Sequence, residues 1–296
     1  MTANLRLAFT ADLHQGVRRA GDEAIRLLVD FLRADPPDVL VLAGDVGAGQ
    51  EFARCLTPFR ELPCRKALVP GNHDIWVEDE DKRGNSLTVY QEYLPRISAD
   101  YRFHYLDNGP LELPEAGLAL VGSMNWYDYS WSLEALQALL PDWEEHLRTK
   151  RFTRGRHNDA RFVRWPLDDA TFTAQVVARF EQHLRQALDK ADKAIVITHH
   201  PPFYGLNFPR PSSSPTVDGL LWDAFSGNRA IEEVLRRNEA HIPFAFCGHT
   251  HRERESPFGR IHGINIGGDY HFKRLIRLEW PSGKTDAYVF GDPQGA

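Results

Sequence analysis

The chain has 296 residues, 42% of them apolar, so it is long enough to bury a sizeable core in one large domain. Its formal net charge of −6 gives no general basic field, so overall charge supports neither a nucleic-acid nor a membrane-surface partner, although nucleic acid is not excluded. Three cysteines without CxxC spacing argue against a disulfide framework and a thiolate metal site, which fits a reducing cytosol.

The N-terminal stretch, residues 1–14, lacks the basic region, apolar stretch and small-residue cleavage site of a secretory leader. No apolar run in the sequence approaches membrane-spanning length. We therefore expect a cytoplasmic protein that does not enter a membrane.

The first third of the sequence alternates strand-like apolar runs with helical patterns. The spacing of apolar residues predicts strands at 5–11, 38–44 and 66–71 and helices at 22–34 and 50–62. This βαβαβ order predicts parallel strands with helices packed over them.

The rest of the chain returns to the same alternation after two segments that are harder to assign. The predicted elements are a hairpin at 111–123 turning at 114–117, a helix at 170–190, a strand at 193–200, a helix at 229–239, and strands at 242–246, 260–268, 272–280 and 285–290. The segments 123–169 and 201–228 are expected to be substrate-site insertions, the second of them a long loop. Without repeats or low-complexity linkers, residues 1–296 are expected to form a single domain.

Five of the predicted strands are followed directly by carboxylate, imidazole or carboxamide side chains. These are Asp12 and His14, Asp45, Asn72 to Asp74, His199 and His200, and His249 and His251. Ligands bind at the carboxyl ends of parallel strands, so we expect these groups to share one site. Asp, His and Asn without Cys suit Mn, Fe, Co or Zn rather than a structural zinc. An aspartate can also bridge two ions about 3.5 to 4 Å apart, an arrangement used for displacement at phosphorus.

The ordered motifs at these strand ends resemble those of the calcineurin-like metallophosphoesterase superfamily. They are Asp12-x-His14, Gly44-Asp45, Gly71-Asn72-His73-Asp74, His199-x-Pro201 and Gly248-His249-x-His251. The resemblance spans residues 12–251 and implies an α/β fold, the superfamily's two-sheet β-sandwich flanked by helices around the βαβαβ core.

The resemblance also implies a binuclear metal centre holding two divalent or trivalent ions, Mn, Fe or Zn. One ion would be held by Asp12, His14, Asp45 and His251, and the second by Asp45, Asn72, His199 and His249. Asp45 is then the bridge, and a hydroxide bridging the two ions would attack phosphorus in line. His73 would assist the leaving group. Asp74 would orient His73 through a hydrogen bond, or else cap the next turn.

Two further groups of residues are candidates for contacting the substrate. Asn125, Trp126 and Tyr127 belong to an aromatic segment that is core by default but follows a predicted strand ending on the metal side, and His200 neighbours His199. The basic stretch 148–164 carries seven Lys or Arg against one Asp. It is either solvated surface or a cover over the metals that attracts a polyanionic or nucleotide-like substrate.

The expected function is hydrolysis of a small-molecule phosphomonoester or phosphodiester. The alternatives are a non-catalytic binding scaffold of the same fold, a protein Ser/Thr phosphatase and a nuclease. All eight motif residues, the seven ligands and His73, are present, which favours an enzyme over a scaffold. The superfamily's protein phosphatases typically carry Glu where this chain has Asp74, and its lipid-precursor pyrophosphatases carry Arg at the His73 position. The sequence leaves the oligomeric state open.

Overall fold

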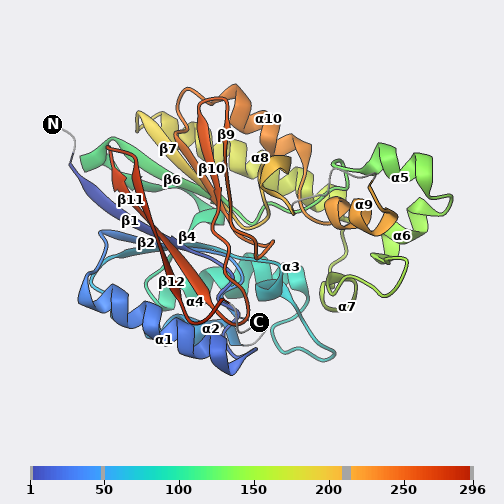
Figure 1. Cartoon of the computed structure of the whole chain (residues 1–296), viewed down its shortest axis with the longest axis horizontal. Helices are drawn as coiled ribbons and strands as arrows, with labels where there is room; N and C mark the ends of the chain where they lie inside the picture. Colours follow the sequence, from blue (N-terminus) through green and yellow to red (C-terminus); the bar gives the residue numbers. More distant parts are fainter. Residues whose placement is uncertain (1–2, 48–50, 209–214, 294–296) are drawn as a thin grey trace.

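The computed structural model of the chain describes residues 3–47, 51–208 and 215–293. Two six-stranded mixed sheets face each other, with helices on their outer sides (Figure 1). The expected α/β fold, a two-sheet sandwich flanked by helices, is confirmed. Within the described ranges, no helix is long and apolar enough to cross a membrane.

The first sheet has the strand order β12-β11-β1-β2-β3-β4. Its strands are β1 (Leu5–Thr10), β2 (Val39–Ala43), β3 (Arg65–Val69), β4 (His104–Tyr105), β11 (Lys273–Trp280) and β12 (Lys284–Phe290). Strands β1 to β4 run parallel, and β11 pairs antiparallel with β1. Every residue of β2 is buried, because the sheet is covered on both faces, and this explains the uninterrupted apolar run in its sequence.

The second sheet has the strand order β5-β6-β7-β8-β10-β9. Its strands are β5 (Leu111–Leu113), β6 (Leu118–Ser123), β7 (Lys193–Thr198), β8 (Phe244–Cys247), β9 (Arg254–Phe258) and β10 (Ile261–Asn265). The hairpin β5–β6 is antiparallel and turns at Gly117 with a φ of 59°, as predicted. Strands β6, β7, β8 and β10 run parallel.

Apolar side chains of both sheets form the core between them, and helices cover the outer faces. Phe9 of β1 stacks on Phe246 of β8 with ring centroids 3.9 Å apart. Helix α1 packs on β11 and β12, and α8 packs on β6 and β7 with α10 beside it. The longer helices are α1 (Arg19–Ala34), α8 (Asp169–Leu188) and α10 (Arg229–Arg237), and the short ones of the body are α2 (Phe52–Leu56), α3 (Ser86–Thr88) and α4 (Leu94–Asp100).

The helix predicted at 50–62 is shorter than expected. Residue 50 lies outside the described residues, and α2 ends at Leu56, followed by a 3₁₀ turn at Thr57–Phe59. Pro58 explains the break, because it has no backbone N–H to donate to the carbonyl of Arg54.

The described helices of the segments 123–169 and 201–228 form a lobe beside the sandwich (Figure 1). Its helices are α5 (Leu133–Leu139), α6 (Trp143–Thr149), α7 (Asp159–Phe162) and α9 (Val217–Ala224). Helix α9 corrects the expectation of a loop throughout 201–228, of which residues 209–214 lie outside the described residues. It forms because Leu220, Leu221 and Ala224 bury one helical face, after a Thr216 side chain caps its first turn.

Candidate functional site

Five loops meet at one edge of the sandwich. Strands β1, β2 and β3 run parallel in one sheet, and β7 and β8 run parallel in the other, so the loops after them emerge together. These loops carry all seven residues expected to bind metal, which are Asp12, His14, Asp45, Asn72, His199, His249 and His251. The structure therefore brings the predicted ligands to one place.

Four of these residues form a tight cluster. The ligand atoms of Asp12, His14, Asp45 and His251 all lie within 4.8 Å of one another. His14 Nε2 is 2.9 Å from His251 Nε2 and 3.6 Å from Asp45 Oδ2. His251 Nε2 is 3.7 Å from Asp12 Oδ1. This is the set expected to hold the first ion.

The remaining ligands lie on the other side of Asp45. His199 Nε2 is 3.1 Å from Asn72 Oδ1 and 3.4 Å from Asp45 Oδ1. The rings of His199 and His249 have centroids 5.2 Å apart. Asp45 thus lies between the two sets with one oxygen toward each, a position from which its carboxylate could bridge two ions.

The backbone of this edge is strained. Positive φ angles occur at five of the ligand positions, namely Asp12 (53°), His14 (44°), Asp45 (50°), His249 (73°) and His251 (55°). A left-handed conformation is unfavourable for residues with a Cβ, and each such residue costs on the order of 1–3 kcal/mol. Strain of this kind persists only where the surrounding packing imposes it, and it turns these side chains toward a common centre.

Two glycines allow the ligands to approach each other. A Cβ on Gly71 would lie 2.0 Å from Asp45 Oδ1, and one on Gly44 would lie 2.3 Å from His199 Nδ1. Neither distance is sterically tolerable. Any side chain at either position would push a ligand away from the centre, which accounts for the glycines in the two motifs.

The charges of the cluster are arranged for a cation. Burial raises the pKa of Asp12. Burial would also raise the pKa of Asp45, but the neighbouring His199 and His73 hold it well below its usual range. Burial would lower the pKa of His199, yet the adjacent Asp45 carboxylate raises it to about 9. The two buried carboxylates of Asp12 and Asp45 therefore favour a bound cation between them.

The imidazoles of the cluster can serve as neutral ligands. Burial lowers the pKa of His14 and of His249 well below the ordinary value, and that of His251 to a lesser extent. Neutral imidazole nitrogens and carboxylate oxygens are the donors that Mn, Fe and Zn accept. The residues present thus fit metal ions.

His73 lies beside the ligands without belonging to their cluster. Its ring stacks on Trp76 with centroids 3.6 Å apart, and its Nε2 is 3.8 Å from Asp45 Oδ2. The side chain is 14% exposed and lines the cavity described below. It is therefore accessible to a molecule bound over the centre.

Asp74 does not bond to the His73 imidazole. Its carboxylate accepts backbone N–H groups of Val46 at 3.3 Å, Gly47 at 3.0 Å and Gly71 at 2.8 Å. Burial and the nearby Asp45 raise the pKa of Asp74 to about 7. Asp74 joins two ligand-bearing loops through their backbones, so the expected orienting bond to His73 is replaced by a structural role.

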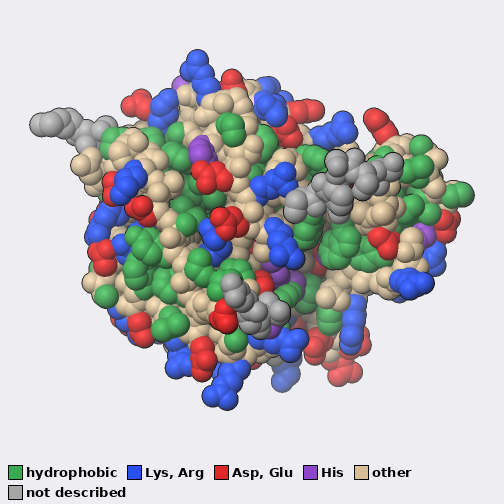
Figure 2. All heavy atoms as spheres, viewed as in Figure 1, with side chains coloured by type: hydrophobic (Ala, Val, Ile, Leu, Met, Phe, Trp, Pro, Cys, Tyr) green, Lys and Arg blue, Asp and Glu red, His purple; other side chains and the backbone are tan. Residues whose placement is uncertain are grey.

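A cavity of about 610 Å³ opens above the centre. Five of the motif residues line it, Asp45, Asn72, His73, His249 and His251. Facing them are Arg154, Gly155, Arg156 and His157 from the basic stretch, and aromatic residues that include Trp76, Trp222 and Tyr270. Figure 2 shows histidine side chains between the body and the lobe, with Lys or Arg side chains beside them. Part of the basic stretch therefore lines the same cavity as the candidate centre.

The residues expected to contact substrate do not line this cavity. Asn125, Trp126, Tyr127 and His200 are all fully buried. The chain turns inward at Asn125, whose φ is 52°, and its Nδ2 donates to the carbonyls of His200 and Pro201 at 3.0 and 3.2 Å. Trp126 and Tyr127 instead stack on each other, with ring centroids 4.5 Å apart, among the buried apolar residues of the core.

Asp159 is a residue of the site that motif reasoning missed. It is 1% exposed and accepts hydrogen bonds from Asn72 Nδ2 at 3.0 Å, Trp76 Nε1 at 2.8 Å and the Tyr127 hydroxyl at 3.0 Å. Burial would raise the pKa of Asp159, but His157 and the hydrogen bonds from Asn72 and Trp76 hold it below its usual range. The sequence offered one signal for it, because Asp159 is the single acidic residue among the seven Lys and Arg residues of the stretch 148–164.

Comparison with known proteins identifies a family. The family model for calcineurin-like phosphoesterase matches residues 5–253. No curated protein matches the sequence. A phosphopantetheinyl hydrolase from Mycobacterium tuberculosis superposes with a TM-score of 0.69 at 19% identity, over 92% of each chain. A dimetal phosphatase from Danio rerio gives 0.56 at 14% identity, over 97% of this chain and 98% of that one. These two similarities establish the fold.

Proposed function

Because the chain belongs to the calcineurin-like phosphoesterase family, we propose that it hydrolyses a small-molecule phosphomonoester or phosphodiester with the help of two metal ions. The ligands would be Asp12, His14, Asp45 and His251 for one ion, and Asp45, Asn72, His199 and His249 for the other. When bound, the ions supply an acidified water as nucleophile and positive charge opposite the phosphoryl oxygens. The observation that carries the proposal is the convergence of seven oxygen and nitrogen donors at one strained edge.

His73 is the proposed partner of the leaving group. It lines the cavity and its ring is held by stacking on Trp76, so its orientation is set without a bond to Asp74. Its Nε2 lies 3.8 Å from the Asp45 carboxylate, at the border between the ligands and the cavity. From there it donates a hydrogen bond or a proton to the departing oxygen.

Asp159 is the proposed positioning residue for Asn72. A carboxamide can present either its oxygen or its nitrogen, and only the oxygen binds a metal. Because Asn72 Nδ2 donates to Asp159, Asn72 Oδ1 faces His199 and the centre. The same carboxylate holds Trp76, on which His73 stacks. One buried aspartate of the lobe thus orients two parts of the site.

The proposal is tested with p-nitrophenyl phosphate and bis-p-nitrophenyl phosphate, using protein stripped of metal and then reloaded with Mn²⁺. Turnover of one ester should depend on the metal and be lost in Asp45→Ala. His73→Ala should lower kcat by about 10²–10⁴-fold, because a positioned proton donor contributes that much. His262→Ala is the matched control, since His262 lies on β10 and pairs with the exposed Glu255.

Two results would contradict the proposal. If no metal restores turnover of either ester while elemental analysis finds two ions bound per chain, the fold is a non-catalytic scaffold. If His262→Ala loses as much activity as His73→Ala, the assigned role of His73 is wrong.

A further inference from the structure

The basic stretch contains a short hairpin that faces the candidate centre across the cavity. Arg151 and Arg156 pair as an antiparallel bridge, and the backbone N–H of Phe152 donates to the Gly155 carbonyl at 3.0 Å. Gly155 makes the turn with a φ of 85°. Arg154 and Arg156, on either side of this glycine, are exposed and line the cavity.

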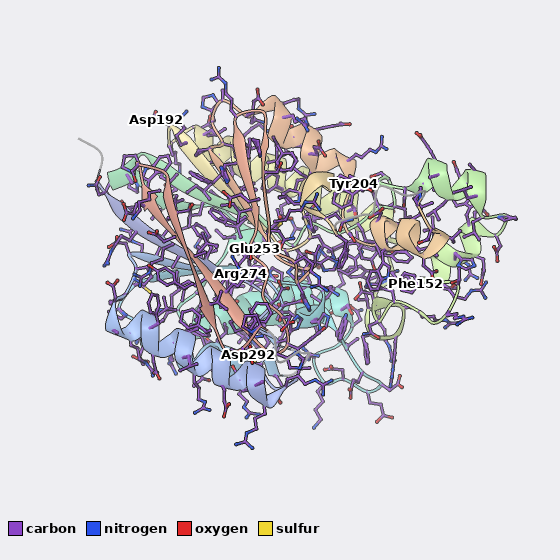
Figure 3. The ribbon with its side chains drawn as sticks, viewed as in Figure 1. Phe152, Asp192, Tyr204, Glu253, Arg274 and Asp292 are labelled. Carbon is purple, nitrogen blue, oxygen red and sulfur yellow. The ribbon has the colours of Figure 1, made fainter. Side chains whose placement is uncertain are left out.

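The hairpin is held in place by the second insertion. The Thr153 backbone N–H and hydroxyl donate to the Asp218 carboxylate of α9 at 2.7 and 2.6 Å. The Phe152 ring lies 4.8 Å from that of Trp222, also on α9, and Figure 3 shows Phe152 within the lobe. Packing between the two insertions therefore determines where Arg154 and Arg156 of the hairpin lie.

These arginines have no charge partner of their own. Within the described ranges, no carboxylate lies at salt-bridge distance from Arg154 or Arg156, whereas Arg151 of the same hairpin lies 3.4 Å from Asp142. A third cavity-lining arginine, Arg252, is likewise without a described partner, because the adjacent Glu253 pairs with Arg274 (Figure 3). Unpaired guanidinium groups around a cavity attract anions.

The two acidic residues that line the cavity, Asp45 and Asp269, lie on the body and not at salt-bridge distance from Arg154 or Arg156. Asp45 belongs to the candidate metal centre. The carboxylate of Asp269 accepts the backbone N–H groups of His271 at 2.7 Å and Phe272 at 3.3 Å. The cavity therefore offers an anion two separate places, the metal centre on the body and the guanidinium pair on the lobe.

We propose that the substrate is a phosphoester whose organic part carries a second phosphate, and that Arg154 and Arg156 bind this second phosphate. This inference rests on the proposed function. A guanidinium group matches phosphate with paired N–H donors. A cavity of about 610 Å³ is of the size that holds an organic ligand, and Trp76, Trp222 and Tyr270 offer aromatic faces for that organic part.

The test compares thymidine 3′,5′-bisphosphate with thymidine 5′-phosphate by isothermal titration calorimetry. The protein is the full chain loaded with Mn²⁺ in the His73→Ala background, with a phosphate-release assay to verify that neither ligand is consumed. The bisphosphate should bind at least ten-fold more tightly than the monophosphate. The double variant Arg154→Gln and Arg156→Gln should reduce this preference to less than two-fold.

Arg151→Gln is the matched control, because Arg151 lies in the same hairpin but pairs with Asp142 and does not line the cavity. It should keep the full preference. Equal binding of the two nucleotides, or a preference that survives the double variant, would overturn the inference. Affinity that keeps rising along oligothymidylates with more than two phosphates would also overturn it, in favour of a nucleic-acid strand.

Binding and turnover separate the two proposals. The preference for the bisphosphate is measured as binding without catalysis, so its result does not depend on whether the p-nitrophenyl esters are hydrolysed. Hydrolysis of those esters without any preference for a second phosphate would leave the proposed function intact and reject the inference alone.

Discussion

Single hydrogen bonds decide how the candidate ligands of this site are oriented. Asn72 reaches the centre with its oxygen because its nitrogen is engaged by Asp159, and the strained backbone at Asp12, Asp45 and His251 turns those side chains inward. Such geometry has little tolerance, because the ligand atoms of the first set already lie within 4.8 Å of one another. Changes at residues that never touch a metal are therefore expected to impair the site.

Asp159 provides the sharpest test of this idea. Asp159→Ala should lower kcat by about 10–100-fold, the usual effect of removing a group that orients a metal ligand. Asp159→Asn should recover most of the loss, because its Oδ1 still accepts from Asn72 and Trp76. Steady-state kinetics and bound Mn²⁺ per chain measure both effects, and thermal melting checks folding. Full activity in folded Asp159→Ala would exclude the positioning role.

At the level of elements, helix α10 is tied to the end of β6 by one residue. Asn228 is fully buried and caps α10 by accepting the Ile231 N–H at 2.8 Å. Its Nδ2 donates to Asn125 Oδ1 and to the Trp126 carbonyl, each at 2.7 Å. The residue that caps α10 therefore also supplies the hydrogen-bond donor for two buried acceptors in the segment that turns inward beneath the lobe.

Asn228→Ala should lower the free energy of unfolding by about 2–4 kcal/mol, because it removes a cap and leaves buried acceptors without a donor. Thr216→Ala is the matched control, since Thr216 is exposed and caps α9 through a single bond to the Gly219 N–H at 3.1 Å. Urea denaturation should show a loss of about 1 kcal/mol for this control. Equal losses would mean that the link to Asn125 and Trp126 contributes nothing.

A second link between elements depends on pH. Asp107 Oδ1 accepts the Tyr90 hydroxyl at 2.6 Å and the Met124 N–H at 3.1 Å, while its buried Oδ2 has no described partner. Burial raises the pKa of Asp107 to about 6. The folded state therefore binds more protons than the unfolded state between pH 3.8 and about 6, so this group lowers stability as pH rises through that range.

Asp107→Asn keeps the oxygen that both donors need and cannot ionise. We expect the unfolding free energy of Asp107→Asn, relative to that of the unchanged protein, to be roughly 2–3 kcal/mol higher at pH 7.5 than at pH 4. This size follows because a shift of one pKa unit corresponds to about 1.4 kcal/mol. Chemical denaturation at both pH values measures this shift. A difference independent of pH would show that Asp107 does not titrate in this range.

Across the whole molecule, the candidate centre joins the two sheets. Asp12, Asp45 and Asn72 follow strands of the first sheet, and His199, His249 and His251 follow strands of the second. Metal bound here would link both halves of the sandwich and neutralise buried carboxylates. Metal occupancy should therefore affect global stability as well as activity.

Adding Mn²⁺ to metal-stripped protein should raise the Tm by several degrees, because a ligand at 1,000 times its Kd stabilises the folded state by about 4 kcal/mol. Asp45→Asn should lose most of this response. Asp192→Asn should keep it, since Asp192 is exposed at the opposite end of the body from the lobe (Figure 3). Differential scanning calorimetry with and without Mn²⁺ measures the change in Tm. An unchanged Tm would argue against metal binding at this edge of the sandwich.

Most of the buried sheet strands were predictable because each of them is a short apolar run of its own. Strands β4 and β9 were not: β4 has two residues, and β9 reads RESPF with none of its residues fully buried. Such edge strands are recruited by pairing with a neighbour rather than by burying their own side chains. The helices of the lobe were missed for a related reason, since their few apolar side chains are buried by segments far apart in the chain, as where Phe162 of α7 stacks on Trp76.

The sequence by itself determined most of the strand-forming runs and the residue types that follow them, and with them the family and the candidate ligand set. These are local properties, because a buried strand needs apolar residues and a metal needs carboxylate and imidazole donors whatever surrounds them. Only the tertiary structure decided that Trp126 and Tyr127 turn into the core, that Asp159 reaches Asn72, and that Arg154 and Arg156 face the centre. Those positions depend on contacts between segments far apart in the chain, which no local pattern encodes.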